Sequence, residues 1–154
     1  IEQIISLAWE GGQHDHDSTH LLAAALAKKF NVTSNFYEFC IYNGYNLRGH
    51  FFNVGRFIPS ENQNVSPKLT IKQVFSYLPL FLKYRSQRKT FLFLFPFIFM
   101  RMALLRTQPI RKVPNHIYTS RPHPKYLYYE RHFNVPFETF INKTRPFIEE
   151  YLNE

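Results

Sequence analysis

Residues 4–20 read IISLAWEGGQHDHDSTH, and this stretch decides which fold class the sequence predicts. The mostly apolar run at 4–9 is typical of a buried strand. A pair of glycines breaks the run, and apolar residues at helical spacing from 21 to about 30 predict a helix whose N-cap is Asp17 or Ser18. A strand, a tight loop and a helix make half of a βα crossover, so we expect an α/β fold.

Periodicity and turn residues predict the other elements of the chain. Alternating aromatic residues indicate a second strand at 35–42, and a weaker pattern indicates another at 50–58. Helical spacing of apolar residues predicts helices at 69–85 and 137–152. Four prolines between residues 109 and 124 indicate an extended loop.

The composition is that of a globular domain rich in aromatic rings. The 154 residues suffice for a single domain, expected to span 1–154, and 18% of them are aromatic. Nineteen Lys and Arg against eleven Asp and Glu give a net charge of +8, which favours contact with polyanions or an anionic membrane. No RRM, zinc-finger or homeodomain pattern accompanies this charge, so we expect no nucleic-acid partner. Cys40 is the only cysteine, which excludes an internal disulfide and suits a cytoplasmic protein.

Residues 90–100 are the most apolar segment, and two interpretations of them stay open. The segment is shorter than the roughly 20 apolar residues that a membrane span needs, and Pro96 interrupts it. It is expected to form either a buried helix or a surface that rests on lipid. The second interpretation supports an alternative function, in which the chain is a non-catalytic, basic, Phe-rich module that binds an anionic membrane surface through residues 91–99.

The densest functional signal is a set of imidazoles and carboxylates that follows the glycine pair. Its members fall within seven residues and are His14, Asp15, His16, Asp17 and His20. Ligands of open α/β sheets bind at the carboxyl ends of strands, where this set begins. The positive end of a helix favours the neutral imidazole, which is the form that binds zinc. A metal site is therefore expected here. The alternative is a group of cap residues and solvated histidines, and His20 alone is expected to be a packing or helix-surface residue.

The segment Glu10-Gly11-Gly12-x-x-Asp15-His16-Asp17 resembles the second motif of the PIG-L/LmbE-like N-deacetylases. Three later segments are similar to other parts of that family. They are residues 72–87, which end in Tyr84-Arg85-Ser86-Gln87, the apolar residues 90–101, and residues 121–130, which begin with Arg121-Pro122-His123-Pro124. The resemblance implies a Rossmann-like layered α/β fold, of which this chain is the C-terminal part, with an incomplete sheet and several helices. It also implies a zinc-dependent hydrolase that removes an acetyl group from a small-molecule or lipid-linked N-acetylglucosamine conjugate.

The resemblance assigns roles to individual residues. His16 falls where the family places its third zinc ligand, and Asp15 falls where a carboxylate supports the neighbouring histidine. Gln13 stands where the family often has a histidine that acts as an acid or holds the developing oxyanion. Glutamine can donate a hydrogen bond to an oxyanion but cannot deliver a proton, so His14 is the alternative acid. The residues expected to contact the substrate are Glu10, Gly12 and His123.

One motif of the family does not occur in residues 1–154. This motif is His-Pro-Asp-Asp, which supplies two zinc ligands and the catalytic base in the family. Because a catalytic zinc needs about three protein ligands plus water, His16 alone does not complete the site. We therefore expect the missing motif upstream of Ile1, and we expect the chain by itself to be inactive. The expected location is cytoplasmic, with peripheral contact to a membrane.

Overall fold

The computed structural model describes residues 1–48, 51–83 and 88–152 of the chain. Its helices are α1 (His14–Lys29), α2 (Ile71–Lys83), α3 (Arg88–Leu105), α4 (Tyr128–Phe133) and α5 (Phe137–Tyr151), and a 3-10 turn spans Thr33–Asn35. Its strands are β1 (Ile4–Leu7), β2 (Phe36–Phe39), β3 (Tyr42–Asn43), β4 (Asn53–Val54), β5 (Asn64–Val65) and β6 (Ile110–Lys112). These helices and a mixed sheet confirm the α/β class with an incomplete sheet.

The main sheet has the strand order β1-β2-β6-β5. β1 and β2 run parallel, with Ile4 opposite Phe36 and Leu7 opposite Phe39. β6 runs antiparallel to both β2 and β5, and β3 and β4 form a small separate sheet. Because β1 and β2 are parallel, their carboxyl ends lie at the same edge of the sheet. The loop that leads into α1 starts at this edge.

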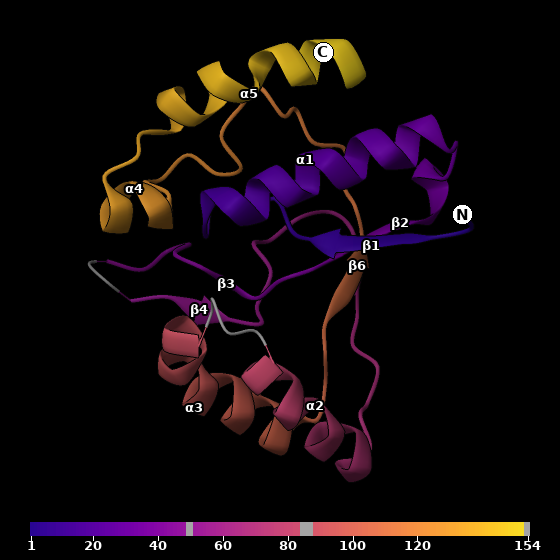
Figure 1. Ribbon diagram of the computed structural model, residues 1–154, viewed down its shortest axis with the longest axis vertical. Coiled ribbons are helices and arrows are strands. Elements are labelled where there is room, and N and C mark those ends of the chain that lie inside the picture. Colours follow the sequence, from indigo (N-terminus) through magenta and orange to yellow (C-terminus); the bar gives the residue numbers. More distant parts are fainter. Residues whose placement is uncertain (49–50, 84–87, 153–154) are drawn as a thin grey trace.

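Helices lie on both sides of the strands (Figure 1). α1 lies against β1, α5 lies outside α1, and α2 and α3 lie on the opposite side of the strands. The main core forms on the α1 side and includes Trp9, Leu21, Ala27, Leu127, Tyr129 and Ile148, which are almost completely buried. Since burying one large apolar side chain contributes about 1.5–3 kcal/mol, this core supplies much of the stability.

The apolar segment at 90–100 lies within α3, and only part of it is buried. Leu94 packs against Tyr42, but Leu92 and Phe93 are 79% and 65% exposed. The expectation of a buried helix is therefore wrong for the outer side of α3. The interpretation as a surface that rests on lipid stays a prediction. No helix among the described residues combines the length and the apolar character needed to cross a bilayer.

Two local predictions differ from the structure. α1 starts at His14 with Gln13 as its N-cap residue, so the predicted cap at Asp17 or Ser18 is wrong. The Asp17 carboxylate accepts hydrogen bonds from the backbone N–H groups of Glu10 and Gly11, at 3.3 and 3.2 Å, and these groups precede the helix. It thus fixes the loop before the helix instead of the first turn.

The proline-rich segment at 109–124 is not loop throughout. β6 lies inside it, between Pro109 and Pro114, and pairs with β2 on one side and β5 on the other. Three residues are too few to show a strand periodicity in the sequence. The predicted strand at 50–58 is short in the structure, where β4 covers only Asn53–Val54.

Replacement of Ile148 by alanine tests whether α5 is part of the main core. Ile148 is completely buried, so Ile148→Ala should lower the free energy of unfolding by about 2–5 kcal/mol through lost contacts and a residual cavity. Urea denaturation measures this change. The matched control is Ile117→Ala, since Ile117 is 67% exposed and its replacement should cost far less. Equal effects of the two substitutions would contradict the packing of α5 on α1.

Candidate functional site

The loop between β1 and α1 is shaped by its two glycines. Gly11 has a φ of +65°, a conformation that L side chains rarely adopt, and a Cβ there would meet the side chain of Leu127. A Cβ on Gly12 would collide with the carbonyl oxygen of Tyr42. What approaches Gly12 closely is thus the backbone of β3. The expected contact of Gly12 with the substrate stays a prediction.

His16 lies in the first turn of α1 and is half-buried. Its ring meets the ring of Tyr42 edge-on, with 5.3 Å between the centroids. Burial lowers the pKa of His16 below its ordinary value, although the negative charge of Asp15 opposes this shift. His16 is therefore held in the neutral form that can bind a metal ion.

His14 and Asp15 form a pair beside His16. His14 Nε2 lies 3.3 Å from Asp15 Oδ1, and the ring of His14 contacts Tyr129 and Phe133 edge-on. The carboxylate predicted to support a neighbouring histidine thus lies against His14 in the structure. An imidazole oriented by a carboxylate is the usual arrangement of a group that takes up or releases a proton.

Gln13 is oriented by the hydroxyl of Tyr42, which donates a 2.7 Å hydrogen bond to Gln13 Oε1. With its oxygen engaged as an acceptor, the amide nitrogen of Gln13 is the group that can donate to another atom. The Tyr42 ring therefore touches His16 while its hydroxyl orients Gln13, so one side chain holds two of the predicted site residues.

Glu10 is buried and engaged with the protein through both carboxylate oxygens. Ile58 N–H donates to Oε1 and Asn43 Nδ2 donates to Oε2, each at 2.9 Å. Burial raises the pKa of Glu10 to about 7, although these two hydrogen bonds oppose the shift. A substrate would have to displace one of these donors, and the predicted substrate contact of Glu10 is untested.

His123 lies apart from the histidines of α1 in the described contacts. It is buried, its ring meets Tyr45 edge-on, and its charged neighbours include Arg131 and Glu130. Burial lowers the pKa of His123 to about 4, and Arg131 adds to the shift. The described contacts of His123 thus lie with Tyr45 and the charged residues around it, and its expected substrate contact stays a prediction. The Tyr84–Gln87 segment of the family resemblance lies outside the described residues.

A buried ion pair between neighbouring strands is the main feature that the sequence analysis missed. Glu38 of β2 stands directly opposite Arg111 of β6, and Arg111 Nε donates a 2.6 Å hydrogen bond to Glu38 Oε1. Both side chains are almost completely buried. Burial raises the pKa of Glu38, but His116, His20 and Arg111 outweigh this effect and hold it below its ordinary value. The sequence did contain a signal for the burial of Glu38. Side chains alternate along a strand, so Glu38 shares a face with the apolar Phe36, and that face is expected to be buried.

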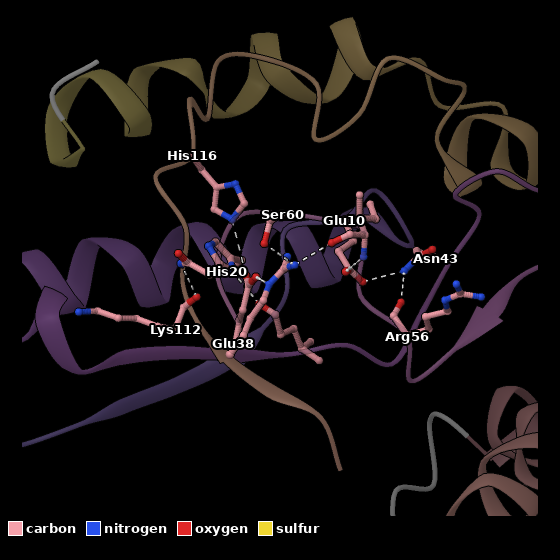
Figure 2. A network of polar contacts seen from close by, with 12 residues as sticks. Glu10, His20, Glu38, Asn43, Arg56, Ser60, Lys112 and His116 are labelled. Carbon is pink, nitrogen blue, oxygen red and sulfur yellow. Dashed lines mark hydrogen bonds and ion pairs between the residues drawn. The ribbon is translucent and has the colours of Figure 1, made fainter. Parts of the chain in front are cut away.

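Two histidines, His20 and His116, complete this cluster at the other carboxylate oxygen of Glu38 (Figure 2). His20 Nδ1 lies 3.6 Å and His116 Nε2 lies 3.7 Å from Glu38 Oε2. One ligand atom from each of the three residues lies within 4.8 Å of the others, so the cluster could hold a metal ion. Glu38 Oε2 and His116 Nε2 are buried without a hydrogen-bond partner among the described residues, which fits such a role.

Two contacts compete with a metal at this cluster. His20 Nδ1 donates a 2.7 Å hydrogen bond to the Leu7 carbonyl, so this nitrogen carries a proton that a metal ion would have to displace. Arg111 already supplies a positive charge to Glu38, which weakens the attraction of the carboxylate for a cation. Burial lowers the pKa of His20 to about 4, so its ring is neutral whether or not a metal binds.

The buried cluster is connected to the β1–α1 loop through one backbone segment. Arg111 Nη1 donates to the Ile58 carbonyl at 2.7 Å and to Ser60 Oγ at 2.9 Å, and the Ile58 N–H donates to Glu10 (Figure 2). Residues 58–60 thus join the ion pair to the residue that precedes the glycines. Comparison with known proteins adds no relative, since no family model, no curated protein and no solved structure matches this chain.

Replacement of Glu38 by glutamine tests the energetic weight of the ion pair. Glu38→Gln leaves the buried Arg111 charge without its partner and should lower the free energy of unfolding by about 3–5 kcal/mol. Glu138→Gln is the matched control, because Glu138 also binds an arginine, Arg121, but is 66% exposed. Its replacement should leave the unfolding midpoint in urea nearly unchanged. Similar losses for both variants would contradict the role given to Glu38.

The pH dependence of stability should contain a contribution from Glu10. The folded-state pKa of about 7 lies above the ordinary 4.5, so the folded protein binds a proton at Glu10 more tightly than the unfolded chain does. The resulting stabilisation is complete below about pH 4.5 and is lost as the pH rises through 7. Glu10→Gln removes this titration, so its stability relative to the parent protein should improve by more than about 1 kcal/mol between pH 4.5 and 8.

Urea denaturation at a series of pH values measures this difference. The uncharged surface substitution Thr19→Ala serves as the control, and its effect should not vary with pH because Thr19 is exposed and does not titrate. A constant difference between Glu10→Gln and the parent protein from pH 4.5 to 8 would show that folding does not raise the pKa of Glu10, and would contradict this prediction.

Proposed function

We propose that this chain is the C-terminal part of a zinc-dependent N-deacetylase, a hydrolase that removes an acetyl group from an N-acetylglucosamine-type conjugate. The observation that carries the proposal is the position of His16. It is a half-buried, neutral imidazole in the first turn of α1, at the edge where the parallel strands β1 and β2 end. Ligands of α/β sheets bind at that edge.

The residues around His16 fit a zinc site in part. A neutral imidazole is a normal zinc ligand, and the ring of this one contacts Tyr42, whose hydroxyl orients Gln13. The other ligands and the base that the PIG-L/LmbE-like family uses lie in the His-Pro-Asp-Asp motif, which residues 1–154 do not contain. The proposal therefore requires that further residues of the protein complete the site.

Zinc, when bound, supplies a water molecule acidic enough to act as a nucleophile near neutral pH and polarises the acetyl carbonyl. The residues of this chain act around that chemistry. Gln13, oriented by Tyr42, donates a hydrogen bond from its amide nitrogen to the carbonyl oxygen as negative charge develops there. His14, held by Asp15, gives a proton to the nitrogen of the leaving amino sugar.

The second place where the chain could hold a metal ion is the buried cluster of His20, Glu38 and His116. It is less suited to hydrolysis of a conjugate, because His20 and Glu38 are completely buried and a substrate has no route to them in this arrangement. Zinc at this position would be structural. The two positions can be separated by substitution, since His16 and His116 belong to different sets of contacts.

The experiment uses the protein that carries residues 1–154 together with the His-Pro-Asp-Asp motif, loaded with zinc. It should release acetate from an N-acetylglucosamine conjugate, and His16→Ala should lower kcat/KM by more than about 100-fold together with the zinc content. Ser18→Ala, on the same helix, is the control and should keep both. Gln13→Ala should lower kcat while the zinc content stays unchanged.

Zinc content also decides between the two metal positions. His116→Ala should keep its zinc and its turnover if the ion belongs to His16. Loss of zinc in His116→Ala together with full zinc in His16→Ala would assign the ion to the buried cluster and overturn the proposed mechanism. A protein that binds zinc but releases no acetate would overturn the proposed activity.

A further inference from the structure

The net charge of the chain is concentrated in one segment. Residues 68–106 contain eight of the nineteen Lys and Arg and none of the eleven Asp and Glu. The rest of the chain therefore holds eleven basic and eleven acidic residues, which cancel. The whole charge of +8 belongs to α2, α3 and the residues at their ends, which we call the α2–α3 hairpin (residues 68–106).

The α2–α3 hairpin also carries a large share of the exposed apolar side chains. Among the hairpin residues whose side chains the structure describes, those that are more than one-third exposed are Ile71, Phe75, Tyr77, Leu92, Phe93, Phe97, Met100, Leu104 and Leu105. Leu92 and Leu104 reach 79% and 75%. Isolated exposed apolar residues are common, but this many of them on two helices that pack on each other are typical of a surface that contacts something apolar.

The same helices have buried sides, so the exposed residues are not the result of loose packing. Val74 of α2 is 4% exposed, and Leu94 and Met102 of α3 are 5% and 7% exposed. Leu94 packs with Tyr42 and Tyr128 in a cluster of its own. α3 therefore attaches to the domain through one side and presents apolar residues on the other.

Exposed basic side chains lie at the ends of this apolar surface. Lys68 and Lys72 are at the start of α2, Lys83 is at its end, and Arg106 follows α3; all four are exposed. Exposed apolar side chains on a segment that carries basic residues and no acidic ones match a bilayer whose headgroups are negative and whose interior is hydrocarbon. Leucine, isoleucine and methionine gain free energy in hydrocarbon but not against a sugar–phosphate backbone, which favours lipid over nucleic acid.

We propose that the α2–α3 hairpin docks the protein on an anionic lipid bilayer. The apolar residues of α2 and α3 enter the headgroup region, and Lys68, Lys72, Lys83 and Arg106 bind lipid phosphates and carboxylates at the rim. The hairpin lies on the side of the molecule opposite α1 and α5 (Figure 1), so docking leaves those helices facing water. This inference rests on the charge and exposure of the hairpin and is independent of the deacetylase proposal.

Vesicle flotation of the whole chain tests the inference. Binding should be strong with phosphatidylcholine vesicles that contain about one-third phosphatidylserine, and at least about tenfold weaker with phosphatidylcholine alone. Raising the salt concentration should weaken binding to the anionic vesicles, since the attraction of the basic residues is screened.

Two pairs of variants separate the apolar and the charged contributions. Leu92→Asp with Leu104→Asp should reduce vesicle binding at least about tenfold, because it removes apolar area and adds negative charge. The matched control is Leu22→Asp with Ile117→Asp, which changes exposed residues outside the hairpin and should keep binding within about twofold. Lys72→Glu with Arg106→Glu should reduce binding, whereas Lys143→Glu with Arg145→Glu on α5 should not.

Several outcomes would overturn the inference. Absence of flotation with either vesicle removes it, and so does binding that is equal with and without phosphatidylserine. Binding that the control variants reduce as much as the hairpin variants would place the contact elsewhere. Retention on RNA without retention on vesicles would make the partner a nucleic acid. A second copy of the chain would be the partner if the protein does not bind vesicles but forms concentration-dependent dimers, and if the double variant Leu92→Asp/Leu104→Asp is monomeric.

Discussion

The buried carboxylate of Glu38 is the constraint on which much of this structure depends. A carboxylate without water is stable only when a positive charge and hydrogen-bond donors surround it. Arg111 meets that need from the opposite position on β6 and in doing so fixes the pairing of β2 with β6. The remaining donors of Arg111 bind the Ile58 carbonyl and Ser60, so a segment without regular structure is held against the sheet.

The same set of contacts reaches the β1–α1 loop and so governs where the histidines of α1 lie. Ile58 N–H binds Glu10, and Asp17 binds the backbone of Glu10 and Gly11 from within the helix. The loop at Glu10 and Gly11 is thus tied both to Ile58 and to the helix. These hydrogen bonds hold the first turn of α1 in place. A fixed position matters for a proposed catalytic group, because a displacement of about 1 Å can lower the rate of catalysis strongly.

The two proposals concern opposite parts of one domain. The proposed hydrolytic residues lie at the first turn of α1, and the α2–α3 hairpin lies on the opposite side of the strands from α1, with Tyr42 packed between His16 and Leu94 of α3. A lipid-linked amino sugar would give both parts a common purpose, since docking would bring the enzyme to its substrate. Each part nevertheless has its own physical basis: neutral, oriented imidazoles in the first case, and apolar area with unbalanced positive charge in the second.

The sequence by itself determined the strand at the start of the chain, the glycine turn, the helix that follows it apart from its first turn, and the last helix at 137–151, because local periodicity and turn residues decide such elements. It also placed His14, Asp15 and His16 at the carboxyl end of a strand. Only the tertiary structure decided that Glu38 binds Arg111, which lies 73 residues away, and that His20 and His116 join them. Such a cluster depends on strand register and on a three-residue strand, and neither leaves a periodic pattern in the sequence.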